Sequence, residues 1–115
     1  MSTPPAGTTV LTAELLGIRG RLGTRATLLQ FSSNFCAPCR STRGLLSWVA
    51  DREPGVRHVE LEVTQHLDLG EALGVTQTPT FFLLGPDGAV LAREDDVPRL
   101  AKVRDLLERL VPAST

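Results

Sequence analysis

Two cysteines, the only two in the chain, stand as Cys36-Ala37-Pro38-Cys39. They follow a short apolar run and open a predicted helix, where unpaired backbone amides carry roughly half a positive charge. Such amides stabilise a thiolate, so we expect Cys36 to ionise readily. Two intervening residues bring both sulfurs within bonding reach as a reversible disulfide. Cys36 would then attack a partner's disulfide, and Cys39, one turn further in, would resolve the mixed disulfide.

Two other uses of such a pair compete with redox chemistry. A complete zinc site needs four ligands, and the remaining candidates, His58 and His66, lie on separate predicted elements without ligand spacing. A permanent structural disulfide is the stronger alternative, but a bridge closing so small a loop removes little entropy from the unfolded chain. We therefore expect redox use, with no metal and no organic cofactor.

The apolar pattern predicts the elements that position this pair. The run from Thr27 to Phe31 is short and apolar, which suits a strand buried on both faces. The stretch from Ala37 to Asp51 has an apolar stripe at i, i+4 spacing, typical of a helix against a core. Elsewhere we predict a short helix capped by Thr12, a strand over Val56 to Val63, a short helix over Leu67 to Leu73, a hairpin of Thr80 to Leu84 with Ala89 to Ala92, and a closing helix over Val97 to Val111.

The order of these elements indicates the α/β class. A helical crossover makes the first two strands parallel, whereas the tight turn at Pro86-Asp87-Gly88 makes the last two antiparallel. The chain is therefore expected to form a mixed sheet covered by helices.

The bulk composition fits one compact domain over residues 1–115, with residues 1–9 a flexible lead-in. Charged residues make up 22% and the net charge is -1, so no general affinity for nucleic acid follows. The apolar runs fall far short of the roughly 20 residues that cross a bilayer, and the N-terminus lacks the features of a secretion signal. As the sequence stands we expect a cytoplasmic monomer; if the chain is a fragment, we expect an extracytoplasmic, membrane-tethered protein.

Two motifs of the chain resemble those of the thioredoxin family. The stretch from Leu28 to Arg40 is similar to the thioredoxin active-site region, and Thr78-Pro79-Thr80 is similar to the cis-proline loop of that family. The resemblance extends from about Thr24 to Leu110. It implies a thioredoxin-like three-layer fold, a central mixed sheet flanked by helices, with a cis bond before Pro79 and Pro79 packed beside Cys36.

The same resemblance implies a surface and partners. The partners would be disulfide-containing proteins, together with an upstream redox partner. The surface that contacts them would consist of Phe35, Ala37, Pro38, Thr78 and Pro79.

Several positions depart from the family pattern. Phe35 and Ala37 replace the usual tryptophan and glycine on either side of the first cysteine. Gln30 stands where thioredoxins have a buried aspartate, and it cannot accept a proton at any useful pH. Glu60 replaces the usual lysine on the adjacent strand. This glutamate resembles the one found in the extracytoplasmic thioredoxin-like proteins that assist cytochrome c maturation. We hypothesise that Glu60 is the buried acid/base for Cys39, its pKa raised by burial; the alternative is a surface glutamate.

Thiol–disulfide exchange with protein disulfides is the function that these residues favour. One alternative is a non-enzymatic module that keeps the fold and holds a partner in the groove around Phe35, Thr78 and Pro79. Another is a dedicated reductase in cytochrome c maturation.

Overall fold

The computed structural model describes residues 9–113, so the predicted flexible segment lies outside them except for Thr9. The strands form one four-stranded sheet in the order β2-β1-β3-β4. Strand β1 pairs parallel with β2 and antiparallel with β3, and β3 pairs antiparallel with β4, so the predicted mixed sheet is confirmed. The strand bounds are β1 Ala26–Ser32, β2 Val56–Glu62, β3 Thr80–Leu84 and β4 Val90–Glu94.

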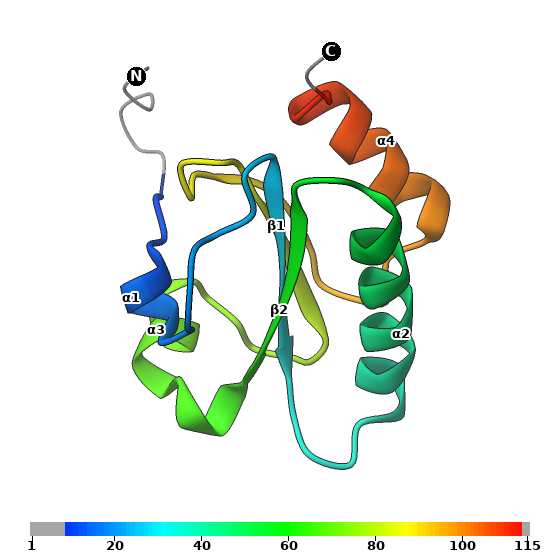
Figure 1. Ribbon diagram of the computed structural model, residues 1–115. Helices are drawn as coiled ribbons and strands as arrows, with labels where there is room; N and C mark the ends of the chain where they lie inside the picture. The colour runs from blue at the N-terminus through cyan, green and yellow to red at the C-terminus, as the bar shows by residue number, and fades with distance from the viewer. Residues whose placement is uncertain (1–8, 114–115) are drawn as a thin grey trace.

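Helices cover both faces of the sheet, which gives the three layers that the resemblance implied (Figure 1). Leu46 and Val49 of α2 and Val103 of α4 pack in one apolar cluster on one face. Leu16 of α1 and Leu69 of α3 belong to the cluster on the other face. The helix bounds are α1 Ala13–Leu16, α2 Ala37–Arg52, the 3-10 turn η1 Val63–Gln65, α3 Leu67–Ala72 and α4 Leu100–Leu110.

Every residue of β1 is buried, as expected for a central strand with helices on both sides. Successive side chains point to opposite faces. Leu28 therefore joins the cluster beneath α2 and α4, whereas Leu29 joins the cluster beneath α1 and α3. By the same alternation Gln30 faces α2, and this places a polar side chain under the start of that helix.

Several element boundaries differ from the sequence expectation, and one short element was not expected. Helix α4 begins at Leu100 and not at Val97, because Pro98 disfavours helical geometry for the residue before it. Strand β4 runs on to Glu94, and Ala89 instead forms an isolated bridge with Val10. The turn η1 was not predicted; the Glu62 carboxylate caps it by accepting a hydrogen bond from the Thr64 amide at 2.8 Å.

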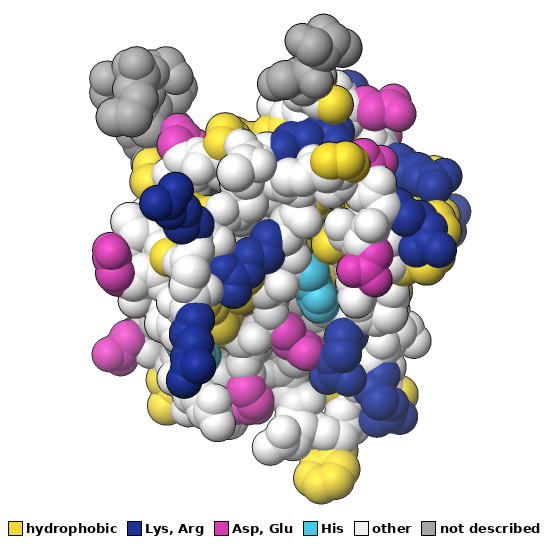
Figure 2. All heavy atoms as spheres, viewed as in Figure 1, with side chains coloured by type: hydrophobic (Ala, Val, Ile, Leu, Met, Phe, Trp, Pro, Cys, Tyr) yellow, Lys and Arg dark blue, Asp and Glu magenta, His cyan; other side chains and the backbone are white. Residues whose placement is uncertain are grey.

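Charged side chains are spread over the surface. On the face that Figure 2 shows, Lys and Arg side chains are interspersed with Asp and Glu side chains. Within residues 9–113, no helix combines the length and the apolar character that crossing a membrane requires.

Candidate functional site

Cys36 is the N-cap residue of α2, at the point where β1 has ended and the helix begins. Its Sγ accepts a hydrogen bond from the backbone amide of Cys39 at 3.1 Å. Pro38 lies in the first turn, where its missing amide hydrogen leaves no bond unmade. The two cysteines are joined as a disulfide, with their Cα atoms 5.1 Å apart. The predicted placement of the pair at the opening of a helix is therefore confirmed.

The two cysteines differ sharply in exposure. Cys39 is completely buried, whereas Cys36 is partly exposed. A partner protein can reach only the Cys36 sulfur, and the Cys39 sulfur can be reached only from within the pair. This asymmetry suits an attacking thiol followed by a resolving thiol.

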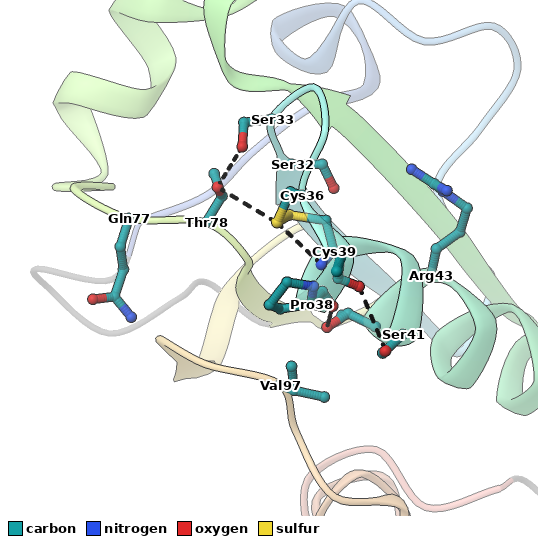
Figure 3. Close-up of a disulfide and its surroundings, with 12 residues drawn as sticks. Ser32, Ser33, Cys36, Pro38, Cys39, Ser41, Arg43, Gln77, Thr78 and Val97 are labelled. Carbon is teal, nitrogen blue, oxygen red and sulfur yellow. Dashed lines mark hydrogen bonds between the residues drawn. A yellow bond between two sulfur atoms is a disulfide. The ribbon is translucent and has the colours of Figure 1, made fainter.

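The loop before β3 comes to the same edge of the sheet as the cysteines. Since β1 and β3 are antiparallel and Phe31 pairs with Thr80, the residues that follow β1 lie beside those that precede β3. The Thr78-Pro79 peptide bond is cis, as the resemblance implied, and Pro79 is buried. The Thr78 hydroxyl points at Cys36, with Oγ1 donating to Sγ at 4.0 Å (Figure 3).

Phe35 lies at the rim of this site with its side chain fully exposed. Its φ of 59° falls in the left-handed region, which non-glycine residues seldom adopt. Ala37 and Pro38 are also exposed. Phe35, Ala37 and Pro38 are therefore accessible to a partner close to Cys36, whereas Pro79, which was also expected to contact partners, is buried.

Comparison with known proteins identifies the fold and the family. The thioredoxin family's sequence model matches residues 21–108.

The chain belongs to the thioredoxin family.

Two curated relatives are mitochondrial thioredoxin-3 of Saccharomyces cerevisiae, 30% identical over 66 residues, and thioredoxin H2 of Arabidopsis thaliana, 33% identical over 57 residues. These matches cover 57% and 50% of this chain, and 51% and 43% of the relatives, so the chain spans about half of their length. Among solved structures, a thioredoxin variant from Halobacterium salinarum superposes with a TM-score of 0.70 at 21% identity, covering 80% of each chain.

Two of the departures from the thioredoxin pattern, Gln30 and Glu60, lie opposite each other on strands β1 and β2. Gln30 is fully buried, and its amide nitrogen donates to the carbonyl oxygen of Cys39 at 2.9 Å and to the Ser32 hydroxyl at 2.8 Å. Its amide oxygen lies 3.1 Å from Nε2 of His58. Gln30 therefore ties the first turn of α2 to strands β1 and β2.

Glu60 does not have the property expected of it. Burial acts to raise the pKa of its carboxyl, but hydrogen bonds from Arg43 and Ser32 and the positive charges of Arg43 and His58 outweigh burial and lower the pKa. The Arg43 guanidinium contacts both carboxylate oxygens, at 2.6 and 2.8 Å, and the Ser32 hydroxyl donates at 2.6 Å. The prediction that burial raises the pKa of Glu60 is wrong, so the hypothesis that Glu60 is the acid/base for Cys39 has no support.

His58 is the other titratable group in this network. Its burial lowers the pKa of the imidazole, and the charge of Arg43 adds to that effect, while the charge of Glu60 opposes it. The ring is therefore disposed to stay neutral and to hydrogen-bond Gln30.

Sequence reasoning missed three members of the site: Ser33, Arg43 and the His58–Gln30 contact. Ser33 Oγ lies 2.7 Å from the Thr78 hydroxyl. The parallel register pairs Gln30 with Glu60 and Leu28 with His58, so His58 and Glu60 lie on the same face of the sheet as Gln30, beneath α2. A local pattern does not reveal register, and the only signal was the polar character of Gln30 and Glu60 on predicted core strands.

The described residues hold no candidate metal centre. Within residues 9–113, no three His, Cys, Asp or Glu side chains gather closely enough to hold a metal ion.

Proposed function

We propose that this thioredoxin-family protein is a thiol–disulfide oxidoreductase that exchanges electrons with disulfides of partner proteins. The observation that carries the proposal is the setting of Cys36: the residue is partly exposed, its sulfur is bonded to that of the buried Cys39, and the same sulfur accepts a hydrogen bond from a backbone amide at a helix N-terminus. Amides in that position stabilise negative charge on sulfur.

The reaction proceeds in two exchange steps from the reduced form. The Cys36 thiolate attacks one sulfur of the partner's disulfide, an S–S bond forms between them, and the other partner sulfur leaves as a thiolate that takes up a proton. The Cys39 sulfur, once deprotonated, then attacks Cys36 Sγ and releases the second partner thiol. Two electrons have passed from the dithiol to the partner, and the same steps in reverse oxidise a partner.

Partner contacts would lie around the exposed sulfur. Phe35, Ala37, Pro38 and Thr78, next to the buried Pro79, would form the surface that receives a disulfide-bearing segment, and the exposed ring of Phe35 supplies apolar area for it. An upstream redox partner would restore the dithiol after each turnover. Action as a monomer and a cytoplasmic location stay predictions.

Reduction of insulin disulfides in the presence of dithiothreitol tests this function. The wild-type protein is expected to accelerate insulin precipitation well above dithiothreitol alone, and Cys36→Ser is expected to return the rate to that background. Cys39→Ser is expected to accumulate a mixed disulfide through Cys36, because the resolving thiol is gone.

Ser41→Ala is the matched control, since Ser41 is an exposed α2 residue and, among the residues that the structure describes, its hydroxyl hydrogen-bonds only to the Ala37 carbonyl, at 3.5 Å. Its rate is expected to equal the wild-type rate. A wild-type rate no higher than that of dithiothreitol alone would contradict the proposal and would be the result expected of a binding module.

A further inference from the structure

Two hydroxyl groups form a chain that ends on the reactive sulfur. Ser33 Oγ and Thr78 Oγ1 lie 2.7 Å apart, and Thr78 Oγ1 is 4.0 Å from Cys36 Sγ, so the three atoms follow one another in space (Figure 3). Ser33 comes from the segment after β1, and Thr78 from the loop before β3. The chain therefore joins the two motifs of the active site.

The hydrogens can be assigned by counting donors. A hydroxyl has one hydrogen to donate. If Thr78 gives its hydrogen to Cys36 Sγ, the hydrogen between Ser33 and Thr78 must come from Ser33. If Thr78 instead donated to Ser33, the sulfur would lose its hydroxyl donor. Donation from Ser33 to Thr78 therefore leaves the Thr78 hydrogen free for Cys36 Sγ.

The contact gains strength when the sulfur is charged. A disulfide sulfur is a weak acceptor, which is consistent with the long 4.0 Å contact in this oxidised form. A thiolate at the same place would accept a charge-assisted bond, roughly twice as strong as a neutral one. Because Ser33 and Thr78 are both half-buried, water competes only partly for these groups.

We propose that Ser33 is a positioning residue for the Cys36 thiolate: it donates to Thr78, and so directs the Thr78 hydrogen onto Cys36 Sγ. The inference deepens the proposed function and rests on it for its biological meaning. The Cys39 amide supplies one donor to this sulfur, and the Ser33–Thr78 pair supplies a second. Ser33 thereby favours the thiolate over both the thiol and the disulfide.

Replacing Ser33 removes no charged side chain from the surroundings of the Cys36 sulfur. Within residues 9–113, none of the nearby charged side chains hydrogen-bonds to Cys36 Sγ, and Arg43 and Glu60 are already paired with each other. Those on the flanking elements are Arg40 and Arg43 of α2 and His58, Glu60 and Glu62 of β2, together with His66, which lines one cavity with Ser33 and Glu62.

The test is the rate of Cys36 alkylation by iodoacetamide in the fully reduced protein, measured from pH 5 to 10. Ser33→Ala is expected to lower the rate at pH 6 by about three- to tenfold and to leave the plateau at high pH unchanged, because the reagent reacts only with thiolate. Thr78→Val, nearly equal in shape, is expected to do the same. Ser33→Ala combined with Thr78→Val is expected to match Thr78→Val alone, since Ser33 acts through Thr78.

Two further variants keep the test decisive. Ser33→Thr retains a hydroxyl and is expected to recover most of the wild-type profile, and Ser41→Ala is expected to leave it unchanged. Circular dichroism checks that each variant is folded, and if Ser33→Ala is not, the comparison of Ser33→Thr, Thr78→Val and wild type decides. An unchanged profile in Thr78→Val, or additive effects in the double variant, would overturn the inference.

Alkylation needs no disulfide substrate. A failure of insulin reduction would therefore contradict the proposed function without changing the alkylation result for Ser33. Likewise, an unchanged alkylation profile would contradict the role of Ser33 without changing the insulin result.

Discussion

At the level of single residues, the four-residue Cys-x-x-Cys segment spans two different environments. Cys36 is partly exposed and its Sγ accepts a hydrogen bond from a helix amide, whereas Cys39 is buried and its carbonyl oxygen accepts a hydrogen bond from Gln30. A thiolate is stabilised by the first environment. The second fixes the backbone of the resolving residue, so that its sulfur lies ready behind the first.

The neutral state of His58 makes stability depend on pH. The pKa of this imidazole in the folded protein lies below its ordinary value of 6.5, so the unfolded chain binds more protons as pH falls below that value. The free energy of unfolding is therefore expected to decrease between pH 7 and pH 5.5, by at most about 1.4 kcal/mol per pH unit for one proton. In His58→Gln, which keeps an amide donor for Gln30, this slope is expected to flatten.

Urea unfolding followed by fluorescence of Trp48, the only tryptophan, measures the slope. Ser41→Ala, which removes no titratable group, is the control and should keep the wild-type slope. The pKa of Glu60 is also lowered, but its contribution is lost only below its ordinary value of 4.5, outside this window. A His58→Gln protein with an undiminished slope would contradict the account of this residue.

Residue-level prediction from the sequence succeeded for the cysteines and failed for Glu60. The two sulfurs lie three positions apart on one helix turn, so local geometry fixes their relation. The environment of Glu60 depends on Arg43, which lies 17 positions earlier in helix α2, and on Ser32 of the neighbouring strand β1. No local pattern specifies such partners, and burial alone gave the wrong direction for its pKa.

At the level of elements, helix α2 carries the site and is continuous through Gly44. A Cβ on Gly44 would meet no atom within 4 Å. Glycine in a helix interior costs roughly 0.5–1 kcal/mol relative to alanine.

Gly44→Ala is therefore expected to raise the free energy of unfolding by about 0.5–1 kcal/mol and to leave insulin reduction unchanged. Gly88→Ala is the opposite case: its φ is 89° and its Cβ would collide with the carbonyl oxygen of Leu11, so we expect a loss of about 2 kcal/mol or more. Urea unfolding at pH 7.5 measures both. Destabilisation by Gly44→Ala would show that α2 is strained at this position.

Most elements could be predicted because each has a local signature. The apolar run of β1, the i, i+4 stripe of α2 and the turn at Pro86-Asp87-Gly88 are all local. The predicted bounds are wrong where a neighbouring residue determines where an element begins or ends. The start of α4 moved to Leu100 because of Pro98, and η1 forms with Glu62 as its cap.

At the level of the whole molecule, the site exists because β1 pairs with β3. That antiparallel pairing brings Thr78 and Pro79 to the end of β1, beside the opening of α2. The order of elements predicted one parallel and one antiparallel pair, but the β1–β3 pairing joins segments about 50 residues apart. Only the resemblance to thioredoxins supplied it, because strand pairing over such a distance has no local signature.

The central claim is that the Cys36–Cys39 bridge opens and closes in function, and a redox titration tests it most directly. The protein is equilibrated in glutathione buffers of defined potential, and the alkylated thiols are counted by mass. The account predicts a single two-electron transition with a midpoint between about −270 and −120 mV, the range of catalytic dithiols. A midpoint below about −300 mV, typical of structural disulfides, would contradict it.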